Sequence, residues 1–504
     1  MNNTQPTAST NGRILARNAL WNLAGLGAPL VVAIAVIPYL IHGLGTERYG
    51  LLTLVWAGIG YFSLFDLGLG RALTKLAAEK LGLGRSEEIP QLVSTAIISM
   101  IGLGILGGIL IGLLCAWLVQ DVLTINPELQ SEALKAFYLT SAGIPLVIST
   151  VGLCAVLEAY QRFDLANAVR IPLGIFNLSS PLVVLLFSQS LVAVIIVLLI
   201  GRVVACFVYI CLCLRVAPCL RTMNVDRSVL GLLLSFGSWM TVTNVVGPIM
   251  LYVDRFLVAA FASMAAVAYY TTAYEVVMKL AIIPDSIAGA LFPAFSISLV
   301  QARGRAAKMF DRGVSYIFLT VFPITLIIVT FASECLEIWL GHEFAQNCTT
   351  VLRWLAVGVF VNSLARIPFV MIQAEGRPDL SAKLHLIELP IYLVTLWWLV
   401  SWRGIEGAAI AWFLRASVDT TGLFALAYWF LPAARPSIRR LSAMLGAALL
   451  VLGLHGVITD VLLKAAVLPV TLGVFAVFTW CFILAAEERQ LLKTKLGIPS
   501  PLGG

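Results

Sequence analysis

The chain has 504 residues, of which 60% are hydrophobic and only 12% are charged, and its mean hydropathy is +0.97. Soluble domains carry roughly 25% charged residues, so this composition excludes a water-soluble globular protein. The net charge of +7 does not indicate nucleic-acid binding, because the basic residues are spread over many short loops. The composition predicts an all-α integral membrane protein.

Apolar runs recur along the whole chain after a polar start, residues 1–13. The first run is too long for a signal peptide and is expected to stay as a helix. A bilayer needs about 20 apolar residues per helix, which predicts about 14 transmembrane helices. Their expected ranges are 14–41, 46–78, 88–118, 130–158, 164–187, 190–214, 229–261, 265–299, 309–332, 347–373, 379–400, 405–430, 440–458 and 463–485.

The two halves of the chain contain a weak internal repeat. Residues 159–165 read AYQRFDL and residues 374–380 read AEGRPDL, and at a similar offset Asp66 corresponds to Asp285. The repeated motif is typical of a tight cytoplasmic turn, in which arginine lies at the interface and aspartate caps the next helix. Six helices per half is an even number, so the halves are expected to share one orientation, about an axis along the membrane normal.

This repeat predicts the domain organisation. We expect two six-helix lobes, two further helices outside the repeat, and polar segments at the ends and in the middle. The expected parts are a cytoplasmic N-terminus 1–13, an N-lobe 14–214, a cytoplasmic linker 215–228, a C-lobe 229–430, the two additional helices 431–485 and a cytoplasmic tail 486–504.

The loops are strongly asymmetric in charge. On the side that carries the N-terminus there are 23 lysines and arginines, against four on the other side. Positive loops stay in the cytoplasm during insertion, so both termini are predicted to be cytoplasmic. The expected location is the cell inner membrane.

The nine cysteines do not indicate a metal site or a cofactor, and none is expected. Cys211, Cys213 and Cys219 are clustered, but they lack four-ligand spacing and histidine partners. Cys335 and Cys348 lie at or near the predicted external face, where oxidation could join them. Whether they pair is left open.

Charged residues within the predicted spans are the strongest functional signal, because each costs at least about 2.5 kcal/mol unless it faces a cavity or a partner. The basic ones are Arg202, Arg255, Lys279, Arg353, Arg366 and Arg415, and the acidic ones are Asp66, Asp254, Glu275, Asp285, Glu388 and Asp419. Five of the six basic residues belong to the second half. A cavity there would be locally cationic.

Some of these charges could neutralise each other within one helix. Glu275 and Lys279 are four residues apart, and so are Arg415 and Asp419. The neighbouring residues Asp254 and Arg255 point about 100° apart, so their partners are expected on other helices. Arg366 has no acid nearby in the sequence, which leaves a role with the substrate or between the halves.

The stretch LIHGLGTERYGLLTLVWAGIGYFSLFDLGLGRALTK resembles the first two helices of the polysaccharide-exporter branch of the multidrug/oligosaccharidyl-lipid/polysaccharide superfamily. The stretch LYVDRFLVAAFASMAAVAYYTTAY resembles the seventh helix of that branch and the loop after it, although it lacks the usual glycine. The resemblance covers roughly residues 14–430. It implies two lobes that open alternately and flip an oligosaccharide carried on polyprenyl diphosphate, with Asp66, Asp254 and Arg255 at motif positions.

The resemblance also implies a cationic cavity for the diphosphate and a driving ion gradient of H⁺ or Na⁺. We therefore expect a non-enzymatic flippase for surface polysaccharide, such as O-antigen, that acts with glycan-assembly proteins. The expected substrate-binding residues are Arg255, Arg366, Lys279, Arg353 and Arg415, and the expected ion-coupling or gating residues are Asp66, Asp254, Glu275, Asp285, Glu388 and Asp419. The resemblance does not fix Lys279, Arg353, Arg366 or Arg415, which are expected from their charges within spans alone.

Two alternative functions remain open at this point. A drug antiporter of the related multidrug branch would usually have twelve helices instead of fourteen. A membrane glycan polymerase or ligase would need a sizeable external loop. The longest external segment that the topology predicts is short, residues 333–346.

Overall fold

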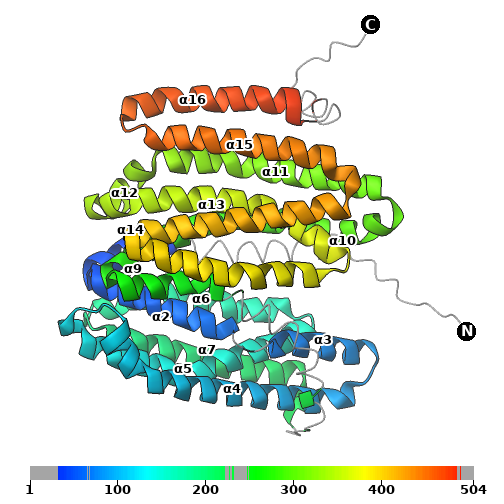
Figure 1. Ribbon diagram of the computed structural model, residues 1–504. Coiled ribbons are helices and arrows are strands. Elements are labelled where there is room, and N and C mark those ends of the chain that lie inside the picture. Colours follow the sequence, from blue (N-terminus) through cyan, green and yellow to red (C-terminus); the bar gives the residue numbers. More distant parts are fainter. Residues whose placement is uncertain are drawn as a thin grey trace, which may run out of the picture. The chain divides into compact units, whose positions relative to one another are not determined.

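The computed structural model describes residues 32–64, 66, 68–221, 226, 230–231, 247, 249–484 and 489. Within these residues every regular element is a helix, which confirms the predicted all-α membrane fold (Figure 1). Nine of the described helices are long and apolar enough to cross a membrane. The predicted count of 14 spans stays a prediction, because parts of the first and seventh spans, and nearly all of both terminal segments, lie outside the described residues.

The chain divides into two compact units, residues 1–271 and 272–504. The division falls within helix α9, Met264–Met278, downstream of the predicted linker 215–228. The predicted lobe boundaries therefore remain a prediction.

Unit 1 is built from long helices that follow the predicted spans closely. They are Val32–Leu44, α2 (Thr46–Leu64), α3 (Leu69–Gly82), α4 (Ile89–Trp117), α5 (Pro127–Ala159), α6 (Phe163–Leu185), α7 (Leu191–Val216) and a helical segment at 249–261. The single span expected at 46–78 is wrong: it is broken into α2 and α3. Gly68 takes a left-handed conformation (φ 74°) at the break, which only glycine adopts without strain.

Helix α5 lies at the centre of unit 1 and packs against α2, α3, α4 and α7. Its close approach to α4 depends on two glycines four residues apart. A Cβ atom on Gly104 would lie 2.6 Å from the backbone of Pro145, and one on Gly108 would lie 2.7 Å from the carbonyl oxygen of Ser141. Small residues at this spacing let membrane helices approach backbone to backbone.

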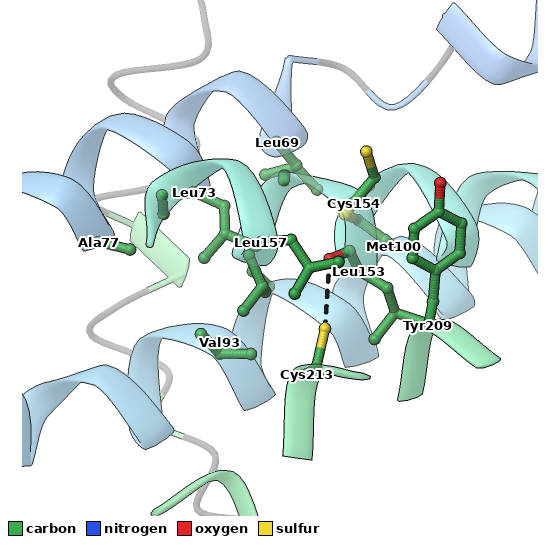
Figure 2. Close-up of a cluster of buried hydrophobic side chains, with 14 of the residues drawn as sticks. Leu69, Leu73, Ala77, Val93, Met100, Leu153, Cys154, Leu157, Tyr209 and Cys213 are labelled. Atoms are coloured by element: carbon green, nitrogen blue, oxygen red, sulfur yellow. Dashed lines mark hydrogen bonds between the residues drawn. The ribbon is translucent and has the colours of Figure 1, made fainter. Parts of the chain in front are cut away.

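An apolar core in unit 1 joins α3, α4, α5, α6 and α7 (Figure 2). Leu73, Leu157 and Met100 are among its fully buried side chains. The Cys213 thiol donates a hydrogen bond to the carbonyl oxygen of Leu153 (3.3 Å), and Cys154 and Tyr209 lie at the end of the cluster opposite Ala77.

Unit 2 contains the rest of α9 and seven further helices. They are α10 (Ile282–Gln301), α11 (Arg303–Thr330), α12 (Ala332–Leu340), α13 (His342–Ala374), α14 (Pro378–Phe430), α15 (Arg435–Val457) and α16 (Val461–Phe478). Helix α13 is the most buried of these and packs against α10, α11, α12 and α14. Within this unit α15 packs on α11.

Three predicted boundaries in unit 2 can be compared with the structure. Helix α14 consists of two arms, 378–403 and 405–430, that meet at Gly404 (φ 56°), which confirms the two spans predicted there. The span predicted at 265–299 is interrupted by a 3₁₀ turn at Lys279–Ala281. The external segment at 333–346 was expected to be a loop, but α12 and the start of α13 occupy it.

The repeated motif forms the same turn in both units. Gln161 (φ 58°) and Gly376 (φ 78°) take the left-handed conformation at equivalent positions. The next residue, an arginine, pairs with an aspartate two residues on at 3.0 Å in each case, Arg162 with Asp164 and Arg377 with Asp379. The prediction of a tight turn is confirmed at both sites, but its aspartate does not occupy the cap position: the N-cap residue is the arginine, and neither helix has a side-chain cap.

Candidate functional site

Asp254 and Arg255 are both deeply buried in unit 1, with 0% and 2% of their surfaces exposed. The Tyr270 hydroxyl donates a hydrogen bond to Asp254 Oδ2 (2.5 Å), so one partner does come from another helix, as predicted. The Arg255 guanidinium lies over the ring of Tyr252, 5.2 Å from its centre. This burial favours a packing role for Arg255 in the described arrangement.

Asp66 sits at the break between α2 and α3. Its two carboxylate oxygens accept hydrogen bonds from the backbone N–H groups of Gly68 (2.9 Å) and Gly70 (2.8 Å). The carboxylate therefore satisfies N–H groups at the start of α3 that have no partner within the helix. A Cβ atom on Gly70 would lie 2.6 Å from this carboxylate, which explains why a glycine follows it.

Arg366 on α13 does find an acid, although none is near it in the sequence. Its Nε atom lies 2.6 Å from Asp285 Oδ1 on α10, and both side chains are close to half exposed. The structure thus pairs one predicted substrate residue with one predicted gating residue of the same unit. Their exposure leaves room for a third charged group.

The remaining basic predictions in unit 2 lie apart from this pair. Lys279 and Glu275 form the expected ion pair, four residues apart and 3.5 Å long. Arg353 donates a hydrogen bond to the carbonyl oxygen of Val329 (3.1 Å). The predicted substrate residues of unit 2 are therefore not gathered into one site.

The expected pair of Arg415 with Asp419 is wrong for the described part of the chain. Arg415 lies over the rings of Trp412 and Tyr392, at 5.3 and 5.6 Å. Asp419 instead accepts a hydrogen bond from the Asn362 amide (3.3 Å) and faces His385. Four residues along a helix allow a pair, but the Arg415 guanidinium lies instead over the two aromatic rings beside it.

A polar cavity of about 400 Å³ lies within unit 1, between α3, α5, α6 and α7. Three arginines line it, together with two acids, a tyrosine and a cysteine: Arg71, Arg170, Arg202, Asp66, Glu158, Tyr209 and Cys154. We call it the unit 1 cavity. Cys154 and Tyr209 also belong to the apolar core, which therefore fixes one wall of the cavity.

Its charges are only partly paired. Arg170 contacts Glu158 (2.8 Å) and donates to the Cys154 sulfur (3.1 Å), and the Asp66 carboxylate is occupied by backbone N–H groups. Arg71 and Arg202 form no ion pair with any residue that the structure describes. Arg202 lies near the middle of the apolar helix α7, where an uncompensated cation is costly. The cavity is therefore suited to an anionic group.

The sequence does not reveal this cavity as a site. It predicts Arg202 as a charge within a span without a role toward the substrate, and Arg71 and Arg170 are among the 23 basic residues of the loops on the N-terminal side. Arg170 lies two turns inside α6, which was a usable signal. Tertiary packing, and not periodicity, brings the three arginines together.

Cys335 and Cys348 are both free thiols, the first exposed and the second buried. Cys335 and Cys348 are therefore not joined by a disulfide in this structure.

Comparison with known proteins places the chain in a family. A family profile described as "Polysaccharide biosynthesis protein" matches residues 15–299. A Shigella flexneri protein named "Putative O-antigen transporter" is 30% identical over 411 residues, which cover 80% of this chain and 96% of that protein.

Solved structures show the same fold at low sequence identity. An inward-facing multidrug resistance MATE family transporter of the MOP superfamily is 15% identical, with a TM-score of 0.69 over 84% of this chain and 96% of that one. The lipid II flippase MurJ in an inward closed conformation is 14% identical, with a TM-score of 0.65 over 90% of this chain and 99% of that one. The chain is a membrane protein of the polysaccharide biosynthesis protein family.

Proposed function

We propose that this chain flips a polyprenyl-diphosphate-linked oligosaccharide from the cytoplasmic to the outer face of the inner membrane, by alternating access, for surface polysaccharide assembly. Family membership and the relative named as an O-antigen transporter support this substrate class. In this proposal glycan-assembly proteins on either side of the membrane supply and receive the glycan. The predicted orientation, with both termini cytoplasmic, is part of the proposal.

One observation carries the proposal furthest: the unit 1 cavity contains two arginines without ion pairs, one of them within a membrane span. A diphosphate supplies the missing negative charge, and its oxygens match the planar fork of N–H donors that arginine presents. Arg202 and Arg71 would hold the diphosphate in this scheme, with Arg170 positioned by Glu158. The sugar would extend into the remaining polar space.

Arg366 of unit 2 is proposed separately as a contact, because it is partly exposed and could exchange its partner Asp285 for a phosphate oxygen. Lys279, Arg353 and Arg415 remain weaker proposals, since each already contacts another group of the protein. Arg255 is also a weaker proposal, because it is buried. The carboxylates Asp254 and Glu275, together with Asp66, Asp285, Glu388 and Asp419, remain proposals for coupling to H⁺ or Na⁺.

The arginine-lined cavity also weighs against the main alternative. A drug antiporter that exports cationic compounds would have to desolvate its cargo beside unpaired arginines, which like-charge repulsion opposes. A polymerase or ligase would act on the same glycans. We favour the transporter over it because the external segment 333–346 is taken up largely by helix, which leaves little room for an acceptor site.

The test is complementation of a strain that lacks this chain, scored by surface polysaccharide and by the amount of the protein in the membrane. Losing one phosphate contact typically forfeits about 1.5–3 kcal/mol, or roughly a ten- to hundredfold loss of affinity. Arg202→Ala should therefore reach normal abundance but fail to restore surface glycan, and Arg202→Lys should restore part of it. Arg366→Ala should likewise reach normal abundance without restoring surface glycan, and Arg366→Lys should restore part of it.

Arg85→Ala is the matched control, because Arg85 is an exposed arginine of the same unit outside the cavity. It should complement fully. Full export by Arg202→Ala at normal abundance would refute the role of Arg202, and low abundance would assign it to folding instead.

A further inference from the structure

Three side chains with metal-ligating atoms converge within unit 2. His385 and Glu388 lie one turn apart on the first arm of α14, and Asp419 lies on its second arm. One ligand atom from each residue lies within 4.8 Å of the other two. Because the chain turns at Gly404 between the two arms, the cluster is a tertiary arrangement and not a sequence motif.

Three carboxylate oxygens in this cluster have no hydrogen-bond partner among the described residues. Glu388 is 3% exposed, and neither of its carboxylate oxygens has a hydrogen-bond partner among the described residues. Asp419 is 6% exposed, and its Oδ1 atom is likewise without a hydrogen bond, whereas its Oδ2 atom is held by Asn362. Buried carboxylate oxygens are rarely left unsatisfied, so this cluster offers unpaired ligand atoms that a cation would bind.

The choice of cation follows from the ligand types and their spacing. An imidazole nitrogen with two carboxylates suits a transition metal, whereas Na⁺ and Mg²⁺ prefer oxygen alone. His385 Nε2 and Asp419 Oδ1 are 3.4 Å apart, and two ligands at about 2.0–2.1 Å from a tetrahedral ion lie roughly 3.3 Å from each other. We propose that His385, Glu388 and Asp419 form a binding site for a divalent transition-metal ion of the Zn²⁺ class.

The surroundings support this assignment. The Asn362 amide on α13 orients Asp419, and the ring of Phe369 stacks on the His385 ring, 6.4 Å between centres. Such partners behind the ligands are a regular feature of metal sites. Besides Asp419 and His385, the charged group that acts on Glu388 is Arg415, whose guanidinium lies over aromatic rings. With His385 neutral, the two carboxylates outnumber Arg415, which favours the binding of a cation.

A bound ion would tie the two arms of α14 to each other, and through Asn362 to α13. The predicted role is therefore to fix the packing of these three helical segments. For Glu388 and Asp419 this metal-binding role takes the place of the coupling role proposed above. The proposal is independent of the transported substrate, and binding can be measured without any transport assay.

The experiment uses the purified full-length chain in detergent, stripped of metal by chelation and titrated with Zn²⁺ by calorimetry. One ion per chain should bind, and Co²⁺ should give visible absorption bands typical of four-coordinate nitrogen and oxygen ligands. His385→Ala and Glu388→Gln should lose saturable binding. Asn362→Ala removes only an orienting partner and should weaken it by about ten- to a hundredfold.

The matched control is His342→Ala. His342 Nδ1 lies 3.4 Å from Glu337 Oε1, the same separation as in the proposed site, but both side chains are well exposed. This variant should bind Zn²⁺ as the wild type does.

Thermal unfolding guards against variants that fail to fold. Zn²⁺ should raise the melting temperature of the wild type but not that of Glu388→Gln, because only a bound ligand stabilises the folded state. Metal-free Glu388→Gln should melt no lower than the metal-free wild type, since the amide removes a buried charge. The proposal is wrong if the wild type binds no Zn²⁺, if the variants bind it equally well, or if only pH or Na⁺ shifts the melting temperature.

Discussion

Lys464 shows at the residue scale how this chain accommodates a buried charge at the end of an apolar helix. Its side chain is 1% exposed on α16, and its ammonium group donates to Glu334 on α12 at 2.7 Å. Burial raises the pKa of Glu334, but hydrogen bonds from Lys464, its own backbone and Ser333 outweigh it, so the net pKa is lowered. The pair ties the added helix α16 to the rest of unit 2.

A pH dependence follows from this pair. Because the pKa of Glu334 is lowered on folding, its contribution to stability is present above its ordinary value of 4.5 and is lost as the pH falls through the lower folded value. Glu334→Gln should cost about 2 kcal/mol at pH 7, below the roughly 3–5 kcal/mol of a fully buried pair, because Glu334 is 23% exposed. Thermal unfolding between pH 7 and pH 3 measures both effects.

Glu337→Gln is the control, an exposed glutamate on the same helix. It should unfold like the wild type at every pH. Equal acid sensitivity in Glu334→Gln and the wild type would show that another group is responsible.

The sequence predicted single charged residues in spans better than it predicted their partners. The Glu275–Lys279 pair needed only helical spacing, and it is confirmed. The pairing of Arg366 with Asp285 and the convergence of His385 on Asp419 depend on which helices lie side by side, and hydropathy does not contain that information. The expectation that the chain has no metal site rests on the spacing of its cysteines alone. That spacing gives no information about His385, Glu388 and Asp419.

At the scale of elements, the repeated turn allows two opposite substitutions at equivalent positions, one in each unit. A left-handed conformation costs a residue with a side chain about 1–2 kcal/mol, and glycine avoids this at an entropic cost of about 0.5–1 kcal/mol. Gln161 and Gly376 occupy the same position in the two turns, and a Cβ atom on Gly376 would meet nothing within 4 Å. Gln161→Gly should therefore stabilise the protein by about 0.5–1 kcal/mol, and Gly376→Gln should destabilise it by a similar amount.

Unfolding curves of the two variants and of the combined double variant measure this exchange. The double variant should return close to wild-type stability, because the turns are in different units. If both single substitutions shift stability in the same direction, the turns are not equivalent.

Helix positions were largely predictable because apolar runs of membrane-spanning length are a strong signal. The predicted ranges 88–118 and 190–214 fall within a few residues of α4 and α7. The break at Asp66 was missed because its cause is local hydrogen bonding and a left-handed glycine, which leave the apolar run uninterrupted. Helix α12 was missed because it is too short to span a membrane.

At the scale of the whole molecule, the proposed function assigns an anionic, lipid-carried substrate to a membrane fold. The fold class followed from composition, and the family is supported by a relative that matches most of the chain. The location of the unit 1 cavity was not predictable, since its arginines come from three helices.

Flipping by the purified protein tests this account most directly. The chain would be reconstituted into vesicles that contain a fluorescent polyprenyl-diphosphate oligosaccharide, and an external quencher would report how much of the lipid reaches the outer leaflet. We predict that the wild type and Arg85→Ala equilibrate the lipid between leaflets, and that Arg202→Ala does so at least about tenfold more slowly. Labelled lipid that never changes leaflet, in vesicles where the same protein moves a small cationic drug, would contradict the account.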